Sequence, residues 1–140
     1  CLALSACATK KVSTGQMQSD VYTGTDTVEY LASGVPDRVF FATNESVLTT
    51  ASRETLRKQA GWLRKNSDVT IVIEGHADER GTREYNLALG QRRAESVADY
   101  LISNGVKRNR LSVKSYGEER PLALGSNNSA WSKNRRVELK

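Results

Sequence analysis

A carboxylate and a guanidinium fifteen residues apart are the side chains in this sequence that could act together on a ligand. Asp78 follows a short apolar run that ends in residues 74–76, and Arg93 lies in the amphipathic segment that comes next. A strand–turn–helix unit folds back on itself, so these two side chains can approach each other. Asn86 lies seven residues before Arg93, which places it on the same helical row and nearer to the helix start.

This grouping suits a ligand that carries both an ammonium group and a carboxylate. Asp78 would accept hydrogen bonds from the ammonium, and Arg93 would hold the carboxylate through two parallel hydrogen bonds. The free N–H groups at the helix start would add favourable partial positive charge. A simpler interpretation is an ion pair between Asp78 and Arg93 that pins the turn to the helix and stabilises the fold little. The spacing alone leaves both interpretations open.

Other carboxylates raise the alternative of an enzyme. Glu74, Asp78 and Glu79 could supply the acid pair that glycoside hydrolysis requires. However, Asp78 and Glu79 are adjacent in a turn, where neighbouring side chains point in different directions. His76 is the only histidine and has no evident serine partner, so no nucleophile–base pair is indicated. The sequence therefore favours binding over catalysis.

Metal and cofactor sites are not indicated by the composition. The cysteines, Cys1 and Cys7, both lie outside the region expected to fold, and a zinc site built from several His or Cys ligands is excluded there. The glycines around residues 75–81 do not form a phosphate-binding loop. We therefore expect no metal and no cofactor.

The charge balance indicates an anionic partner without identifying it. The chain has 140 residues, enough for one domain and a tail, and a net charge of +5. No run of Lys and Arg is interleaved with aromatic residues, so nucleic acid is not favoured as a partner. No apolar stretch is long enough to span a bilayer.

The first residues resemble the end of a lipoprotein signal peptide. Residues 1–6 are apolar and then small, and Leu4-Ser5-Ala6-Cys7 is similar to a bacterial lipobox, in which Cys7 would carry the lipid. Ala8, rather than Asp, favours the outer membrane in the lipoprotein pattern. The alternative is a small apolar strand with two incidental cysteines. Residues 7–26 are predicted to be a lipidated N-terminus and flexible tether with a mean span of about 25 Å.

Residues 27–140 are predicted to form one domain with alternating strands and helices. Residues 27–31 could be an edge strand or one helical turn. The most apolar run, 69–73, is expected to be a central strand covered on both faces. Strands are also expected at 38–41, 110–116 and 136–139, helices from about 50 to 66 and from 82 or 83 to 104, and a short helical turn at 127–131. The order β-α-β-α-β-(α)-β indicates an α/β (α+β) two-layer sandwich of the split βαβ kind.

Four sequence motifs resemble the OmpA C-terminal-like family of peptidoglycan-binding domains. The longest is G-H-A-D-E-R-G-T-R-E-Y-N-L-A-L-G-Q-R-R-A at residues 75–94. The others are R-V-F-F-A-T-N-E-S at 38–46, S-Y-G-E-E-R-P at 115–121 and S-K-N-R-R-V-E-L at 132–139. Together they extend the resemblance over roughly residues 37–140.

This resemblance implies non-covalent binding of peptidoglycan through the meso-diaminopimelate of its stem peptide. That side chain ends in an ammonium and a carboxylate on one carbon. Carried over by motif position, Asp78 would hold the ammonium and Arg93 the carboxylate, Asn86 would contribute its amide, and Asn44 would close the pocket. Arg135 is a further candidate.

The resemblance also implies a role and partners. Ala42 departs from the family pattern, where an Asp is common, so a polar contact at that position is in doubt. A lipid anchor with a tether implies a non-enzymatic link between outer membrane and cell wall on the periplasmic face. It also implies a place in the Tol–Pal system of envelope integrity and cell division, with TolB and other Tol proteins as partners. The alternative is a peptidoglycan-cleaving enzyme that uses Glu74 or Glu79.

Overall fold

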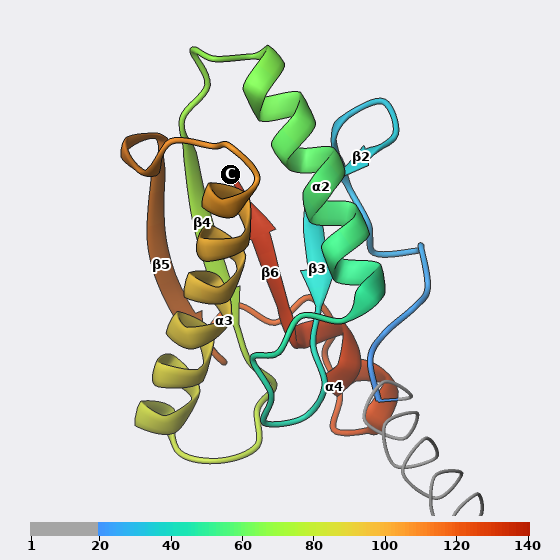
Figure 1. Cartoon of the computed structure of the whole chain (residues 1–140). Helices are drawn as coiled ribbons and strands as arrows, with labels where there is room; N and C mark the ends of the chain where they lie inside the picture. Colours follow the sequence, from blue (N-terminus) through green and yellow to red (C-terminus); the bar gives the residue numbers. More distant parts are fainter. Residues whose placement is uncertain (1–19) are drawn as a thin grey trace, which may run out of the picture.

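The computed structural model describes residues 20–140, which form two layers (Figure 1). One layer is a four-stranded sheet in the order β3-β6-β4-β5, and the other consists of the helices α2 and α3, which lie on one face of that sheet. The sheet strands are β3 (Arg38–Phe40), β4 (Ile71–His76), β5 (Leu111–Gly117) and β6 (Arg136–Leu139). The helices are α2 (Thr50–Lys65), α3 (Arg83–Ser103), the short α4 (Asn128–Asn134) and the 3-10 turn η1 (Arg108–Arg110). This architecture confirms the predicted fold class.

The sheet is mixed, and its pairing explains where α3 must lie. β4 pairs in parallel with β5 and antiparallel with β6, and β6 pairs antiparallel with β3. Two parallel neighbours cannot be joined by a tight turn, so the chain crosses over the sheet between them. Helix α3 is that crossover, and it carries Asn86 and Arg93 over the end of β4.

Both long helices begin and end at residues whose side chains or backbone suit those positions. Thr49 caps α2 by accepting from the Ser52 N–H at 3.0 Å, and Thr82 caps α3 by accepting from the Tyr85 N–H at 3.1 Å. Helix α3 ends at Asn104, and Gly105 follows in the left-handed conformation with φ of 95°. The predicted limits of both helices are confirmed to within about a residue.

The core lies between the sheet and the two helices. It contains aliphatic side chains from both helices and from β3, β4 and β6, including Leu56 and Leu63 of α2, Val97 and Leu101 of α3, and Ile73 of β4. Helix α3 approaches β4 most closely where two glycines meet. A Cβ built on Gly75 would lie 1.8 Å from the carbonyl oxygen of Gly90, so the two backbones are in direct contact there. This contact fixes the height of α3 above the end of β4.

The expectation that the central strand is covered on both faces is wrong. Helices cover only one face, toward which Ile71 and Ile73 point, and Val72 on the opposite face is 37% exposed. The opposite face is lined instead by charged side chains, Arg136 and Glu138 among them. A continuous apolar run suggested double coverage, but alternate side chains of a strand face opposite sides and only one side meets the helices.

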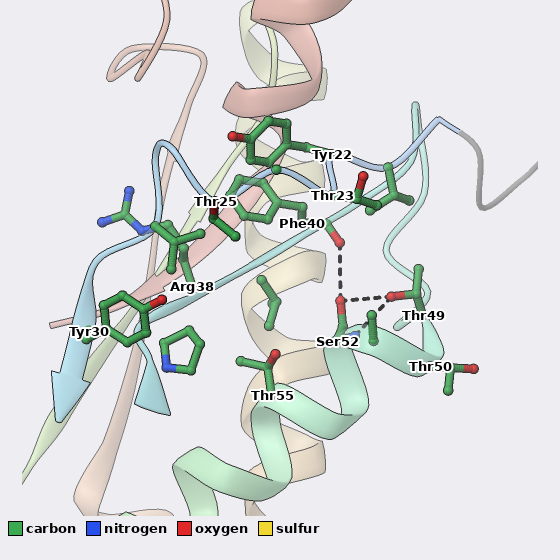
Figure 2. Close-up of a pocket in the computed structure, with 16 residues that line it drawn as sticks. Tyr22, Thr23, Thr25, Tyr30, Arg38, Phe40, Thr49, Thr50, Ser52 and Thr55 are labelled. Atoms are coloured by element: carbon green, nitrogen blue, oxygen red, sulfur yellow. Dashed lines mark hydrogen bonds between the residues drawn. The ribbon is translucent and has the colours of Figure 1, made fainter. Parts of the chain in front are cut away.

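The segment before the sheet lies against the domain. Residues 20–26 were predicted to be part of the tether, whereas Tyr22 packs edge-on against Phe40 with ring centroids 4.8 Å apart (Figure 2). Lys133 of α4 donates to the Asp26 carboxylate at 3.2 Å. A two-stranded hairpin of β1 (Tyr30–Ala32) and β2 (Val35–Pro36) follows, turning at Gly34. Its first strand overlaps residues 27–31, which could be an edge strand or a helical turn, at Tyr30 and Leu31, and it belongs to this hairpin and not to the four-stranded sheet.

Some predictions fall outside this part of the chain. The proposed lipidation residue Cys7 and the predicted tether before Asp20 lie outside the described residues. Within residues 20–140, no helix is both long enough and apolar enough to cross a membrane.

Candidate functional site

Asp78 lies in the loop that leaves β4 for α3, at the end of the molecule where the loop after β3 and helix α4 also lie (Figure 1). The neighbouring Ala77 N–H donates to the Gly117 carbonyl at 2.8 Å, which extends the sheet pairing up to the site. The Arg80 backbone N–H donates to Asp78 Oδ1 at 3.0 Å, which closes a local turn. The Asp78 residue is only 7% exposed.

Two arginine side chains saturate this carboxylate. Arg80 donates from Nε to Oδ1 at 3.2 Å and from Nη2 to Oδ2 at 2.9 Å. Arg135 donates from Nη1 to Oδ2 at 3.1 Å. Burial raises the pKa of Asp78, but the hydrogen bonds from Arg80 and Arg135 outweigh it and hold the pKa below its usual range. Asp78 is therefore an anion at neutral pH.

Arg93 is fully buried and donates to backbone carbonyls. Its Nε donates to the Glu45 oxygen at 2.8 Å, its Nη1 to the His76 oxygen at 2.8 Å and its Nη2 to the Ala42 oxygen at 3.0 Å. Burial, with repulsion from Arg135, lowers its pKa to about 10, so it remains a cation at neutral pH. Arg93 thereby ties the loop after β3 to the end of β4.

The ion pair between Asp78 and Arg93, which was the simpler interpretation of the sequence, is not formed. The ion pairs of Asp78 within residues 20–140 are with Arg80 and Arg135. Arg93 is nevertheless near enough for the Asp78 charge to raise its pKa. The neighbouring Arg92 is exposed.

Asn86 and Asn44 approach the site from two different elements. Asn86, in the first turn of α3, is buried and donates from Nδ2 to Glu118 Oε1 at 2.8 Å. Asn44 lies on the loop after β3 with φ of 60°, a left-handed conformation that Asn tolerates. Its Oδ1 accepts from the Tyr85 hydroxyl at 3.2 Å. Both side chains thus hold loops in place around Asp78.

Arg135 lies at the centre of the site. The Arg135 side chain, 2% exposed, donates from Nε to the Phe41 carbonyl at 3.0 Å as well as from Nη1 to Asp78. Its Nη2 donates to the Asp20 carbonyl oxygen at 2.7 Å and to Asp20 Oδ1 at 3.2 Å. One guanidinium therefore joins β3, the Asp78 loop and the segment before the sheet.

Sequence reasoning missed Arg80 and Asp20, which both take part in the site. Arg80 closes over Asp78, with its guanidinium carbon 4.1 Å from the centroid of the Trp131 ring and its Nη2 3.2 Å from Thr43 Oγ1. Asp20 accepts from the Thr43 backbone N–H at 2.7 Å. The position of Arg80, two residues after an Asp in a turn, could have indicated its contact. Nothing in the local sequence indicated Asp20.

The carboxylates of the enzymatic alternative have separate surroundings. Glu79 is exposed and accepts from Ser126 Oγ at 2.8 Å. Glu74 lies on β4 with its Oε1 4.0 Å from His76 Nε2. Neither carboxylate shares a hydrogen-bonding partner with Asp78.

The charged sheet face holds the one group of potential metal ligands found among residues 20–140. The ligand atoms of Glu74, His76 and Glu138 lie within 4.8 Å of one another. However, Glu138 already pairs with Arg136 and also with Arg38 at 3.3 Å. A dication there would face both guanidinium groups, so this donor set does not suit a metal.

The described residues also form a partly open pocket of about 330 Å³. Figure 2 shows its lining by the segment before the sheet, β3 and the start of α2, including Tyr22, Phe40 and Ser52. Ser52 Oγ donates to the Phe40 carbonyl at 3.3 Å across its floor. The lining is mainly apolar and contains none of the predicted site residues.

Comparison with known proteins gives consistent matches. The profile of the OmpA family matches residues 40–135. A peptidoglycan-associated lipoprotein of Brucella melitensis is 53% identical over 103 residues, which are 74% of this chain and 61% of that protein. One from Pseudomonas aeruginosa is 57% identical over 76 residues, covering 54% of this chain and 45% of that protein. The chain spans about three fifths of the length of the first of these curated relatives.

Solved structures match the fold described above. The crystal structure of the peptidoglycan-associated lipoprotein from Burkholderia pseudomallei has a TM-score of 0.72 and 39% identity, over 74% of this chain and 87% of that chain. The C-terminal domain of Helicobacter pylori MotB has a TM-score of 0.69 and 27% identity, over 74% of this chain and 82% of that chain.

Proposed function

The chain belongs to the OmpA family, and on that premise we propose that it binds peptidoglycan without cleaving it. The observation that carries the proposal is the 53% identity, over a stretch of 103 residues, to a protein named for its association with peptidoglycan. The buried, charged Asp78 at the end of β4 supplies the chemistry that such binding requires.

The ligand we propose is meso-diaminopimelate, through the end of its side chain that carries an ammonium and a carboxylate. Asp78 accepts the ammonium because its pKa is held low and it stays ionised. Its oxygens already accept from Arg80 and Arg135, so the ammonium must take the place of a donor. Arg80 is the donor that can leave, since its side chain is 39% exposed.

The sequence predicted that Arg93 binds the ligand carboxylate directly, and the proposal replaces this role with an indirect one. Its Nε, Nη1 and Nη2 each already donate to a carbonyl oxygen, and the side chain has no exposed surface. We assign Arg93 a positioning role, in which it holds the loop that contains Asn44 against the end of β4. Asn86 acts similarly by donating to Glu118, which lies just after β5.

Sedimentation with purified peptidoglycan tests this proposal. We expect Asp78→Ala to lose most of its co-sedimentation, because the ammonium loses its anionic partner. Asp99→Ala is the matched control, since Asp99 is an exposed carboxylate of α3 and its removal changes the net charge equally. Equal pelleting of Asp78→Ala and the parent chain would refute the site. Release of soluble wall fragments that is lost in Glu74→Gln would instead favour the cleaving enzyme.

We further propose that the protein is anchored in the outer membrane by lipid on Cys7 and faces the periplasm. The similarity of Leu4-Ser5-Ala6-Cys7 to a lipobox and the lipoprotein names of the relatives support this. Mass spectrometry of the native N-terminus should find acyl chains on Cys7. An unmodified Cys7 would contradict the anchor.

TolB and the Tol–Pal system are the partners we propose from the family resemblance. A pull-down of purified TolB by the full chain tests this directly. Retention of TolB is the expected result, and absence of retention at micromolar concentrations would remove TolB from the proposal.

A further inference from the structure

A second carboxylate, that of Asp20, lies in the candidate site beside Asp78. Asp20 Oδ2 accepts from the Thr43 backbone N–H at 2.7 Å, and Asp20 Oδ1 accepts from Arg135 Nη2 at 3.2 Å. The same Nη2 donates to the Asp20 carbonyl oxygen at 2.7 Å. The Arg135 side chain is buried and rigidly held by Phe41 and Asp78, so the Nη2 edge that meets Asp20 is a preformed donor for an anion.

The position occupied by the Asp20 carboxylate is close to Asp78, because the same Arg135 guanidinium contacts both carboxylates. Arg135 donates from Nη1 to Asp78 and from Nη2 to Asp20. A ligand with an ammonium and a carboxylate on one carbon presents its two charges at a similarly short separation. Its ammonium can bind Asp78 while its carboxylate contacts Nη2 of Arg135 and the N–H of Thr43.

We propose that the Thr43 N–H and Arg135 form the carboxylate-binding half of the site, and that Asp20 occupies it until a ligand carboxylate takes its place. This inference rests on the proposed function, which it deepens by separating the two halves of the site. Asp78 binds the ammonium, and the pair of Thr43 and Arg135 binds the carboxylate. Arg93 supports both halves from within the fold.

Asp20 is held as an effective internal competitor. Burial raises the pKa of Asp20, but hydrogen bonding to Thr43 and the charges of Arg135 and Arg80 outweigh it and lower the pKa, so the side chain is an anion at neutral pH. The packing of Tyr22 on Phe40 and the pair of Asp26 with Lys133 keep the segment beside the site. An attached competitor acts at a high effective concentration, which weakens the apparent affinity of a free ligand.

Calorimetric titration of the full chain with free meso-diaminopimelate tests the inference. We expect Asp20→Ala to bind about 3- to 10-fold more tightly than the parent, because the competing carboxylate is gone. Asp68→Ala is the matched control: it removes an exposed carboxylate from the turn before β4, at the opposite end of that strand from Asp78, and should leave the affinity unchanged.

The amide signal of Thr43 supplies a second readout that a structural role alone would not change. In Asp20→Ala the Thr43 amide proton should shift upfield, and meso-diaminopimelate should shift it back downfield as the new carboxylate accepts from it. Equal or weaker binding by Asp20→Ala, with the parent still binding, would overturn this inference and leave the proposed function standing. Failure of both chains to bind would overturn the proposed function as well.

Discussion

Two buried arginines at the candidate site have different partners and therefore different roles. Arg93 donates to three carbonyl oxygens of the chain, whereas Arg135 donates to two carboxylates as well as to carbonyls. Carbonyl contacts fix loop geometry, while carboxylate contacts mark a position that an external anion can take. Both arginines are adjacent in space, since Arg135 lowers the pKa of Arg93.

Replacing Arg93 should mainly lower the free energy of unfolding, because the side chain holds loops in place and does not contact the ligand directly. Arg93→Ala leaves three carbonyl oxygens without their donor, and each such loss costs about 1–3 kcal/mol. We expect the free energy of unfolding in urea to fall by at least about 3 kcal/mol. Arg92→Ala, which alters the exposed neighbour, should change it by less than about 0.5 kcal/mol. Similar values for the two variants would contradict the positioning role.

His76, the only histidine, should make the protein less stable in mild acid. Burial lowers its pKa to about 3, and the charges of Arg136, Arg120 and Arg38 add to this, while Glu138 opposes them. The unfolded chain binds a proton near pH 6.5 and the folded chain does not, so stability is complete above pH 6.5 and falls as the pH drops toward 3.

Urea titrations at two pH values measure this effect. The His76 contribution to the free energy of unfolding should fall by about 2 kcal/mol from pH 7 to pH 5. His76→Phe should lose that part of the pH dependence, whatever its stability at pH 7. An unchanged dependence in His76→Phe would show that other groups cause it.

At the scale of elements, the contact between β4 and α3 positions the site. A Cβ on Gly75 would lie 1.8 Å from the Gly90 carbonyl oxygen, which is backbone and cannot rotate away. Gly75→Ala should therefore push α3 outward, cost about 3 kcal/mol and weaken peptidoglycan co-sedimentation, because α3 carries Asn86 and Arg93.

A glycine on the other long helix is the control for this prediction. At Gly61 of α2 the nearest atom to an added Cβ is the end of the Arg64 side chain, at 3.8 Å. Gly61→Ala should stabilise the fold by up to about 1 kcal/mol through helix propensity and leave co-sedimentation unchanged. A Gly75→Ala protein that is as stable as the parent would show that α3 does not depend on the glycine contact.

The sequence predicted the elements well because local signals mark their ends. The helix expected from 82 or 83 to 104 and the strand expected at 136–139 match α3 and β6 to within a residue. Coverage of β4 was not predictable in the same way, because it depends on where the helices lie and not on the strand itself. The packing of residues 20–26 also depends on distant partners, chiefly Phe40 and Lys133.

The candidate site was predicted in its position but not in its hydrogen bonds. Asp78, Asn86 and Arg93 do gather at the end of β4. Which arginine meets Asp78 could not be derived, because long side chains reach several neighbours and the choice depends on burial. The carbonyl partners of Arg93 were not foreseeable either, since backbone groups leave no trace in residue types.

At the scale of the whole molecule, displacement of Asp20 by a ligand would change how far the domain can extend from Cys7. With Asp20 in the site, twelve residues lie between it and Cys7, a covalent span of at most about 45 Å. If a ligand releases residues 20–26, the free chain would extend to about Thr27 and could reach roughly 70 Å. If Cys7 is the anchor, as proposed, binding to the wall would thereby increase the maximum distance between the anchor and the folded domain.

The proposed site recognises an ammonium and a carboxylate together. Competition against peptidoglycan co-sedimentation tests it most directly, with free meso-diaminopimelate compared with cadaverine, the same diamine without either carboxylate. Because Asp78 and the pair of Thr43 and Arg135 bind the two charges separately, we predict that meso-diaminopimelate releases the protein from the wall and that cadaverine does not at equal concentration. Equal release by both, or release by neither, would contradict recognition of the paired charges.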